Sequence, residues 1–155
     1  MEPYFVSLFG HRDILEHRKI EQRLTKILRE LASTKEFVEI YIGRNGEFDV
    51  FAASVVKRET KKDGYGNVGM TLVLPYGNKN EEYYETYYDG LIIPECVEGT
   101  HPKGAIKKRN QWMVERSDLV ICFCERETGG AYYAMKYADS LGKKTINLAK
   151  EDNLF

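Results

Sequence analysis

The stretch that decides the fold is Asp118-Leu119-Val120-Ile121-Cys122-Phe123-Cys124, which is followed three residues later by Thr128-Gly129-Gly130. After one acidic residue the run is almost continuously apolar, which is typical of a central strand with both faces covered. The segment from about Gly130 then places small and apolar residues on one face of a predicted helix, and Gly142 ends it. This pattern indicates a buried strand that leads through a glycine loop into a helix.

The same alternation of strand and helix extends over the rest of the chain. Short apolar runs predict further strands at 4–9, 37–42, 70–74, 90–93 and 144–148. Helical spacing predicts helices that begin near Ile14, where Asp13 can cap the first turn, and that cover about 49–62, 80–88 and 103–117. Such alternation predicts a Rossmann-like, three-layer α/β/α fold with a mostly parallel sheet of five to six strands. We expect one domain over residues 1–155, because a chain of this length can bury one good core.

Composition limits the classes of function. The net charge is −1, which does not favour a polyanionic partner, so we do not expect the chain to bind nucleic acid. The odd cysteine count of 3, without a signal peptide or an apolar run of about 18 residues, predicts a soluble cytoplasmic protein with reduced thiols. The 3 histidines show no metal-ligand spacing, so we expect neither a metal nor a cofactor.

Unusual residues follow three of the predicted strands. Gly10-His11-Arg12 follows the first, Gly43-Arg44-Asn45-Gly46 the second, and 125–130 the central one. Parallel α/β sheets bind ligands outside the carboxyl ends of their strands, where these loops should meet. Glycines allow close approach of the backbone, and a following helix adds its positive end, so Thr128-Gly129-Gly130 is the best candidate for a phosphate or carboxylate cradle. An ordinary tight turn is the alternative for that segment.

Several side chains in these loops have two open interpretations. Arg12 can clamp a phosphate in a bidentate pair or form a surface salt bridge with Glu16. His11 can donate to the same anion or be structural. Asp49 can accept ribose hydroxyls or satisfy free amides at a helix start, and Glu47 is expected to face solvent.

The predicted helix before the central strand carries a group of basic residues. Arg109 shares with Met113 a face that can look inward. Three lysines precede it, where they oppose the helix dipole, and they either meet an anionic partner or form a solvated face: Lys103, Lys107 and Lys108. Four tyrosines between 83 and 88 either stack on a base or pack under a loop or at a subunit contact.

Four motifs together extend over nearly the whole chain: Phe9-Gly10-His11-Arg12, Gly43-x-x-Gly46-x-x-Asp49, the run from Arg109 to Asp118, and Thr128-Gly129-Gly130-Ala131. In this order they resemble the YpsA-like branch of the SLOG superfamily. The resemblance implies a bacterial or phage Rossmann-like domain that binds nucleotides or their derivatives, and it implies a homodimer. The superfamily includes LOG phosphoribohydrolases, the DNA-processing protein DprA and ligand-sensing domains of defence systems.

The residues and the resemblance together predict a ligand-binding set. It consists of Gly10, His11, Arg12, Gly43, Arg44, Asn45, Gly46, Asp49, Arg109, Met113, Thr128, Gly129, Gly130 and Ala131. By resemblance, Gly129 and Gly130 hold phosphate, Arg109 faces the ligand and Asp49 lies near the sugar.

One departure from the LOG pattern bears on catalysis. LOG enzymes carry Gly-Gly-x-Gly-Thr-x-x-Glu, whereas residues 129–136 here lack the second Gly-Thr and the glutamate. We therefore expect a module that binds or senses a small nucleotide-type ligand. The first alternative is an N-glycosidic hydrolase or transferase acting on a nucleoside monophosphate, with Asp49 or Glu47 as the catalytic carboxylate. The second is a DprA-like binder of single-stranded DNA, against which the near-neutral charge speaks.

Overall fold

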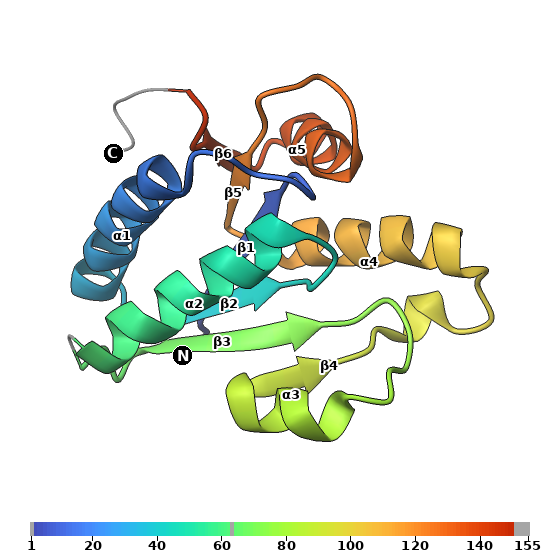
Figure 1. The fold of residues 1–155 in the computed structure, drawn as a ribbon, viewed down its shortest axis with the longest axis horizontal. Helices are drawn as coiled ribbons and strands as arrows, with labels where there is room; N and C mark the ends of the chain where they lie inside the picture. Colours follow the sequence, from blue (N-terminus) through green and yellow to red (C-terminus); the bar gives the residue numbers. More distant parts are fainter. Residues whose placement is uncertain (1, 63, 151–155) are drawn as a thin grey trace.

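The computed structural model describes residues 2–62 and 64–150, and these build one six-stranded, fully parallel sheet (Figure 1). The strands are β1 (Tyr4–Gly10), β2 (Val38–Ile42), β3 (Val68–Val73), β4 (Gly90–Ile92), β5 (Leu119–Phe123) and β6 (Lys144–Asn147). Their spatial order is β4-β3-β2-β1-β5-β6. The predicted Rossmann-like α/β fold is therefore confirmed, with the decisive apolar run forming β5.

Five α-helices connect the strands, and one 3₁₀ turn, η1 (Glu95–Val97), precedes the fourth of them. The helices are α1 (His17–Thr34), α2 (Glu47–Lys62), α3 (Glu81–Tyr87), α4 (Pro102–Arg116) and α5 (Gly130–Ser140). The first helix begins at His17, later than predicted from Ile14, and Asp13 does not cap it. Asp13 instead accepts a hydrogen bond from Arg126 at 3.3 Å, so the loop before α1 contacts the loop between β5 and α5.

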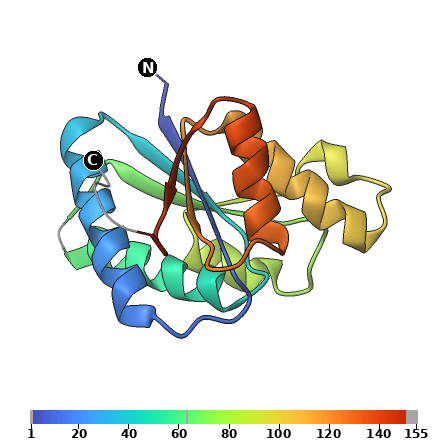
Figure 2. The same cartoon turned by 90° about the horizontal axis from the view of Figure 1, so that it is seen from above.

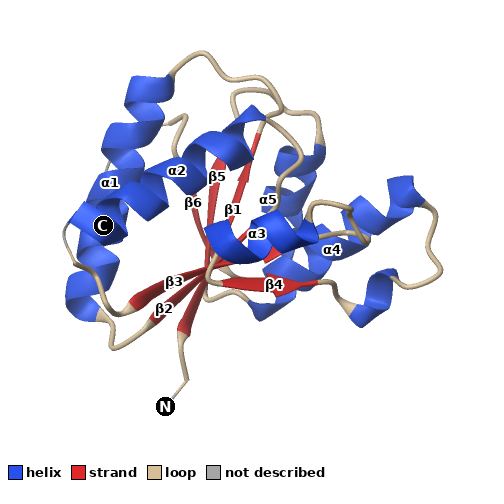
Figure 3. Ribbon diagram, turned by 60° about the horizontal axis from the view of Figure 1, so that its bottom comes forward, coloured by secondary structure: helices blue, strands red, loops and turns tan. Residues whose placement is uncertain are grey.

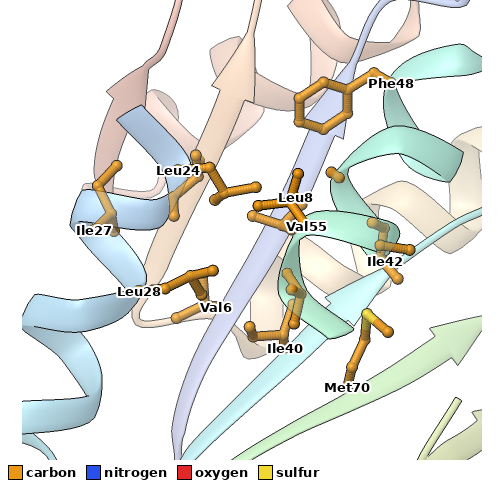
Figure 4. Packing of buried hydrophobic residues seen from close by; sticks show 14 of the residues in the cluster. Val6, Leu8, Leu24, Ile27, Leu28, Ile40, Ile42, Phe48, Val55 and Met70 are labelled. Atoms are coloured by element: carbon orange, nitrogen blue, oxygen red, sulfur yellow. The ribbon is translucent and has the colours of Figure 1, made fainter. Parts of the chain in front are cut away.

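The helices cover the sheet in two layers, as Figures 2 and 3 show from two directions. Helices α1 and α2 pack on one face, where aliphatic side chains of α1 such as Leu24 and Leu28 share a buried cluster with Val6, Leu8 and Ile40 (Figure 4). Burial of each such side chain contributes roughly 1.5–3 kcal/mol, so this cluster is a main source of stability.

The opposite face is covered by α4 and α5 with smaller side chains. Three alanines of α5, Ala131, Ala134 and Ala138, form a buried cluster with Cys122 of β5 and with Cys124, which directly follows that strand. Small residues let α5 approach the sheet closely, and this places its first turn directly over the end of β5. Both cysteines are free and buried, as predicted.

The position of β1 defines where a ligand can enter. β1 lies between β2 and β5, so the chain leaves it toward one side through α1 and returns on the other side through β5. Loops that diverge in this way open a crevice at the carboxyl edge of the sheet, and Rossmann-like folds bind their ligands there. Within the described residues, no helix combines the length and apolar character needed to span a membrane.

Candidate functional site

A cavity of about 270 Å³ lies at the crevice between β1 and β5. It brings together eleven of the fourteen residues predicted to bind a ligand, namely Gly10, His11, Arg12, Asn45, Gly46, Asp49, Arg109, Thr128, Gly129, Gly130 and Ala131. The rest of its lining is Phe9, Asp13, Ile106, Asn110 and Arg126. Three loops and helix α4 thus converge on one site, as expected from the carboxyl edge of a parallel sheet.

His11 joins the loop after β1 to the loop after β5. Its ring is buried, and Nε2 accepts hydrogen bonds from the backbone N–H groups of Glu125 at 2.9 Å and Arg126 at 3.3 Å. Because Nε2 accepts both bonds, it carries no proton of its own to donate to an anion. Burial lowers the pKa of His11, and the charge of Arg126 lowers it further. His11 therefore acts here as a neutral support for the β5–α5 loop.

Two exposed arginines lie at the mouth of the cavity. Arg12 makes no ion pair within the described ranges 2–62 and 64–150, and its predicted partner Glu16 pairs instead with Lys19 at 3.4 Å. Arg126 pairs with Asp13 at 3.3 Å, and both side chains are largely exposed. The hydrogen bond from Arg126 lowers the pKa of Asp13. Exposed pairs of this kind contribute little to stability, so both guanidinium groups are available to an anion.

Arg109 is a buried crosslink beneath the cavity. Its side chain is only 3% exposed and donates from Nη1 to the Val73 carbonyl at 2.8 Å, from Nη2 to Asn45 Oδ1 at 2.7 Å, and from Nε to Asn110 Oδ1 at 2.9 Å. Burial lowers the pKa of Arg109, and the nearby Asp49 carboxylate opposes that shift. The guanidinium thus ties the end of β3, the loop after β2 and helix α4 together.

The two candidate carboxylates occupy different environments. Asp49 is buried, and its Oδ2 accepts the Asn45 N–H at 2.9 Å. Burial raises the pKa of Asp49, while that hydrogen bond and the charge of Arg109 lower it. This geometry favours the role at the start of α2 over the ribose contact. Glu47 is exposed, lies outside the cavity, and accepts from the backbone N–H of Ile14, in the loop before α1, at 3.3 Å.

Three of the predicted glycines are required by packing within the protein. A Cβ atom on Gly10 would lie 2.0 Å from Phe48 Cγ. A Cβ atom on Gly43 would lie 2.8 Å from Arg109 Nη1, and one on Gly46 would lie 2.5 Å from the Arg12 Cα. The expected reason for these glycines is close approach of a ligand, whereas the structure shows neighbouring protein atoms at all three positions. Gly129 differs, because its φ of +95° is rarely adopted by other residues and nothing lies within 4 Å of its Cβ position.

The three remaining predicted residues lie outside the cavity. Arg44 points toward helix α3, where it donates to the Tyr88 hydroxyl at 3.1 Å and lies 5.2 Å from the centre of the Tyr84 ring. Met113 is fully buried in the α4–α5 layer. Gly43 is covered by Arg109, as described above. Arg126, which the predicted set omitted, could have been found as the basic residue that follows the central strand.

Comparison with known proteins gives a structural likeness. No family model matches the chain, and no curated protein matches its sequence. DNA processing protein A from Streptococcus pneumoniae superimposes with a TM-score of 0.65 at 15% identity, over 92% of this chain and 49% of that one. DNA processing protein A from Helicobacter pylori, whose structure describes a single-stranded DNA binding mode, superimposes with a TM-score of 0.63 at 19% identity, over 97% and 67% of the two chains.

Both neighbours are DNA processing proteins. At these identities the likeness concerns the fold, and the chain spans about half (49%) of the length of the S. pneumoniae protein. The likeness is one of fold, and both the superfamily and its YpsA-like branch stay predictions.

The expectation that nucleic acid is not a partner is wrong, because a protein of this same fold binds single-stranded DNA. The physical reason is that a net charge of −1 is a sum over the whole chain, whereas binding of a phosphate depends on the charges close to a site.

Proposed function

We propose that this chain binds single-stranded DNA and holds a backbone phosphate in the cavity between β1 and β5. The observation that carries the proposal is the convergence of the exposed Arg12 and Arg126 side chains with the first turn of α5 at Gly129-Gly130. Guanidinium groups bind phosphate oxygens through charge-assisted hydrogen bonds, and a helix start supplies unpaired N–H groups. The DNA-binding neighbour of the same fold supports this choice of ligand.

Fluorescence anisotropy with a labelled single-stranded oligonucleotide, measured over a series of salt concentrations, tests this function. Arg12→Gln and Arg126→Gln should each weaken binding and reduce the slope of log K against log salt by about 1, because each removes one phosphate contact. The matched control is Arg116→Gln, which removes an exposed arginine that contacts Trp112 at the other end of α4. Absence of binding at low salt, or equal effects of all three variants, would refute the proposal.

A single small nucleotide is a second candidate ligand, and the size of the cavity favours it. Its volume of about 270 Å³ is close to the lower end of small-molecule sites, roughly 300–1,000 Å³. A nucleoside monophosphate present at about 100 times its dissociation constant should stabilise the fold by about 2.7 kcal/mol in a thermal-shift assay. Recovery of the intact nucleotide would support a binding module, whereas free base and sugar phosphate would indicate a hydrolase.

A further inference from the structure

A second cavity adjoins the proposed phosphate site and runs between α4 and α5, which lie side by side in Figure 2. Its volume is about 430 Å³. It shares three lining residues with the first cavity, Ile106, Asn110 and Gly130, so the two cavities are direct neighbours. We call it the α4–α5 groove, and its remaining lining is Lys103, Lys107, Gln111, Tyr133, Ala134 and Tyr137.

The groove combines an exposed aromatic ring with positive charge. Tyr133 is 64% exposed although its ring is large and apolar, and Ile106 and Ala134 form the adjoining apolar wall. Lys103 and Lys107 lie one helical turn apart at the rim, and in the part of the chain that the structure describes neither forms an ion pair. Among the described residues that line the groove there is no carboxylate, although the Tyr137 hydroxyl donates to Glu115 Oε2 at 2.5 Å. Its chemistry therefore suits a flat, apolar group that is attached to an anion.

Asn110 lies at the junction of the two cavities, and its amide donors have no partner among residues 2–62 and 64–150. Its Oδ1 accepts a hydrogen bond from Arg109 Nε at 2.9 Å, and Nε can only donate, so the amide oxygen must face Arg109. The amide NH₂ is thereby turned away from Arg109, and Nδ2 lies 3.7 Å from the Cβ position of Gly130. A donor that the protein itself orients is placed where a ligand would pass from one cavity into the other.

From these contacts we propose that the α4–α5 groove holds a nucleobase of the strand whose phosphate occupies the first cavity, a proposal that rests on the function proposed above. The base stacks on the Tyr133 ring against the Ile106 wall, and the Asn110 NH₂ donates to the base or its sugar. Lys103 and Lys107 bind the next phosphate along the strand. Stacking on an aromatic side chain accepts any base, so the groove contributes affinity without sequence preference.

The test compares an oligothymidylate with an abasic oligomer of the same length and number of phosphates, both measured by anisotropy. Tyr133→Ala should weaken binding of the oligothymidylate about tenfold, because one stacked base is lost. Tyr133→Phe should restore that affinity, and neither variant should change binding of the abasic oligomer. Tyr83→Ala is the matched control, since Tyr83 is 57% exposed on α3 and lines neither cavity.

The possible failures can be told apart. If wild-type protein binds both oligomers equally, or if Tyr133→Ala leaves oligothymidylate binding unchanged, the base site is refuted while phosphate binding stands. If wild-type protein binds neither oligomer at low salt, both the proposed DNA binding and the proposed base site are refuted. Replacing both Lys103 and Lys107 by Gln should weaken both oligomers alike, since their role concerns phosphate.

Discussion

The two walls of the cavity between β1 and β5 are built in different ways. The wall formed by the loop after β2 rests on Arg109, whose three bonded nitrogens and buried neighbour Asp49 form one connected network. The wall formed by residues 125–130 is exposed at every position, and its first two N–H groups share the single acceptor His11 Nε2. One wall is a frame fixed by buried bonds, and the other is a surface loop held by His11 and by the exposed Arg126–Asp13 pair.

This difference separates residues that build the site from residues that are free to bind. Segments with few buried contacts open at lower free energy than the core, so the β5–α5 loop can adjust to a ligand. Arg109 was predicted to face a ligand, yet three of its donors are already bonded to protein acceptors. Arg12 and Arg126 have exposed guanidinium groups, which suits them to direct contact. Substitutions in the two walls should therefore have different consequences.

The largest effect is expected from Arg109→Met. Removing one partner of a buried charged network leaves Asp49 uncompensated and typically costs about 3–5 kcal/mol of unfolding free energy. Urea denaturation measures this loss directly. Lys108→Met is the matched control, because Lys108 is the exposed neighbour on α4 and, within the described part of the chain, its side chain bonds Thr100 alone, at 3.1 Å.

The double variant Arg109→Met with Asp49→Asn sharpens this test. Neutralising the stranded carboxylate should recover part of the lost stability, so the two substitutions should not be additive. Equal stabilities of Arg109→Met and Lys108→Met would contradict the view that this wall is a frame.

A smaller effect that depends on pH is expected at His11. Its pKa is lowered by burial and by Arg126, against the opposing charges of Glu125 and Asp13. Between the folded pKa and the unfolded value of about 6.5, the unfolded chain binds more protons, so stability falls as the pH drops through that window. The stabilisation of the folded state that comes from neutral His11 is fully present above about pH 6.5. In His11→Gln the side-chain oxygen can still accept a hydrogen bond but does not titrate.

The measurement compares unfolding free energies of wild type and His11→Gln between about pH 7.5 and about pH 5.5, on either side of the usual histidine pKa. The unfolding free energy of wild type should exceed that of His11→Gln by less as the pH falls. A difference that stays constant over this range would show that proton binding at His11 does not weaken the contact with the β5–α5 loop.

The fold and the place of the site could be predicted because both follow from local patterns. The apolar run at 118–124 and the helical spacing after Gly130 are readable within a few residues, and parallel strands bring their carboxyl ends to one edge. The partners of individual side chains could not be predicted. Arg109 bonds the carbonyl of Val73, 36 positions away, and Arg44 turns toward Tyr88. Such contacts depend on how helices sit on the sheet.

Two further errors have the same origin. Gly43 and Gly46 are required by the positions of Arg109 and Arg12, and no local pattern distinguishes a glycine packed against protein from one that faces a ligand. The net charge of −1 likewise does not show where individual charges lie, because it sums every side chain of the chain. The role of a glycine and the charge around a site both depend on spatial neighbours, which local sequence and composition do not show.

The smallest expected effect is a gain of affinity in Asp13→Asn. Asp13 pairs with Arg126 at the mouth of the cavity and so competes with a bound phosphate for the same guanidinium. Removing its charge should strengthen binding of single-stranded DNA modestly and leave the urea midpoint unchanged, because the pair is exposed. The gain should disappear in an Arg126→Gln background and should shrink as salt rises. Weaker binding in Asp13→Asn would instead mean that Asp13 positions Arg126 for the phosphate. The loop 125–130 would then be held in place by its own ion pair, as the opposite wall is held by Arg109.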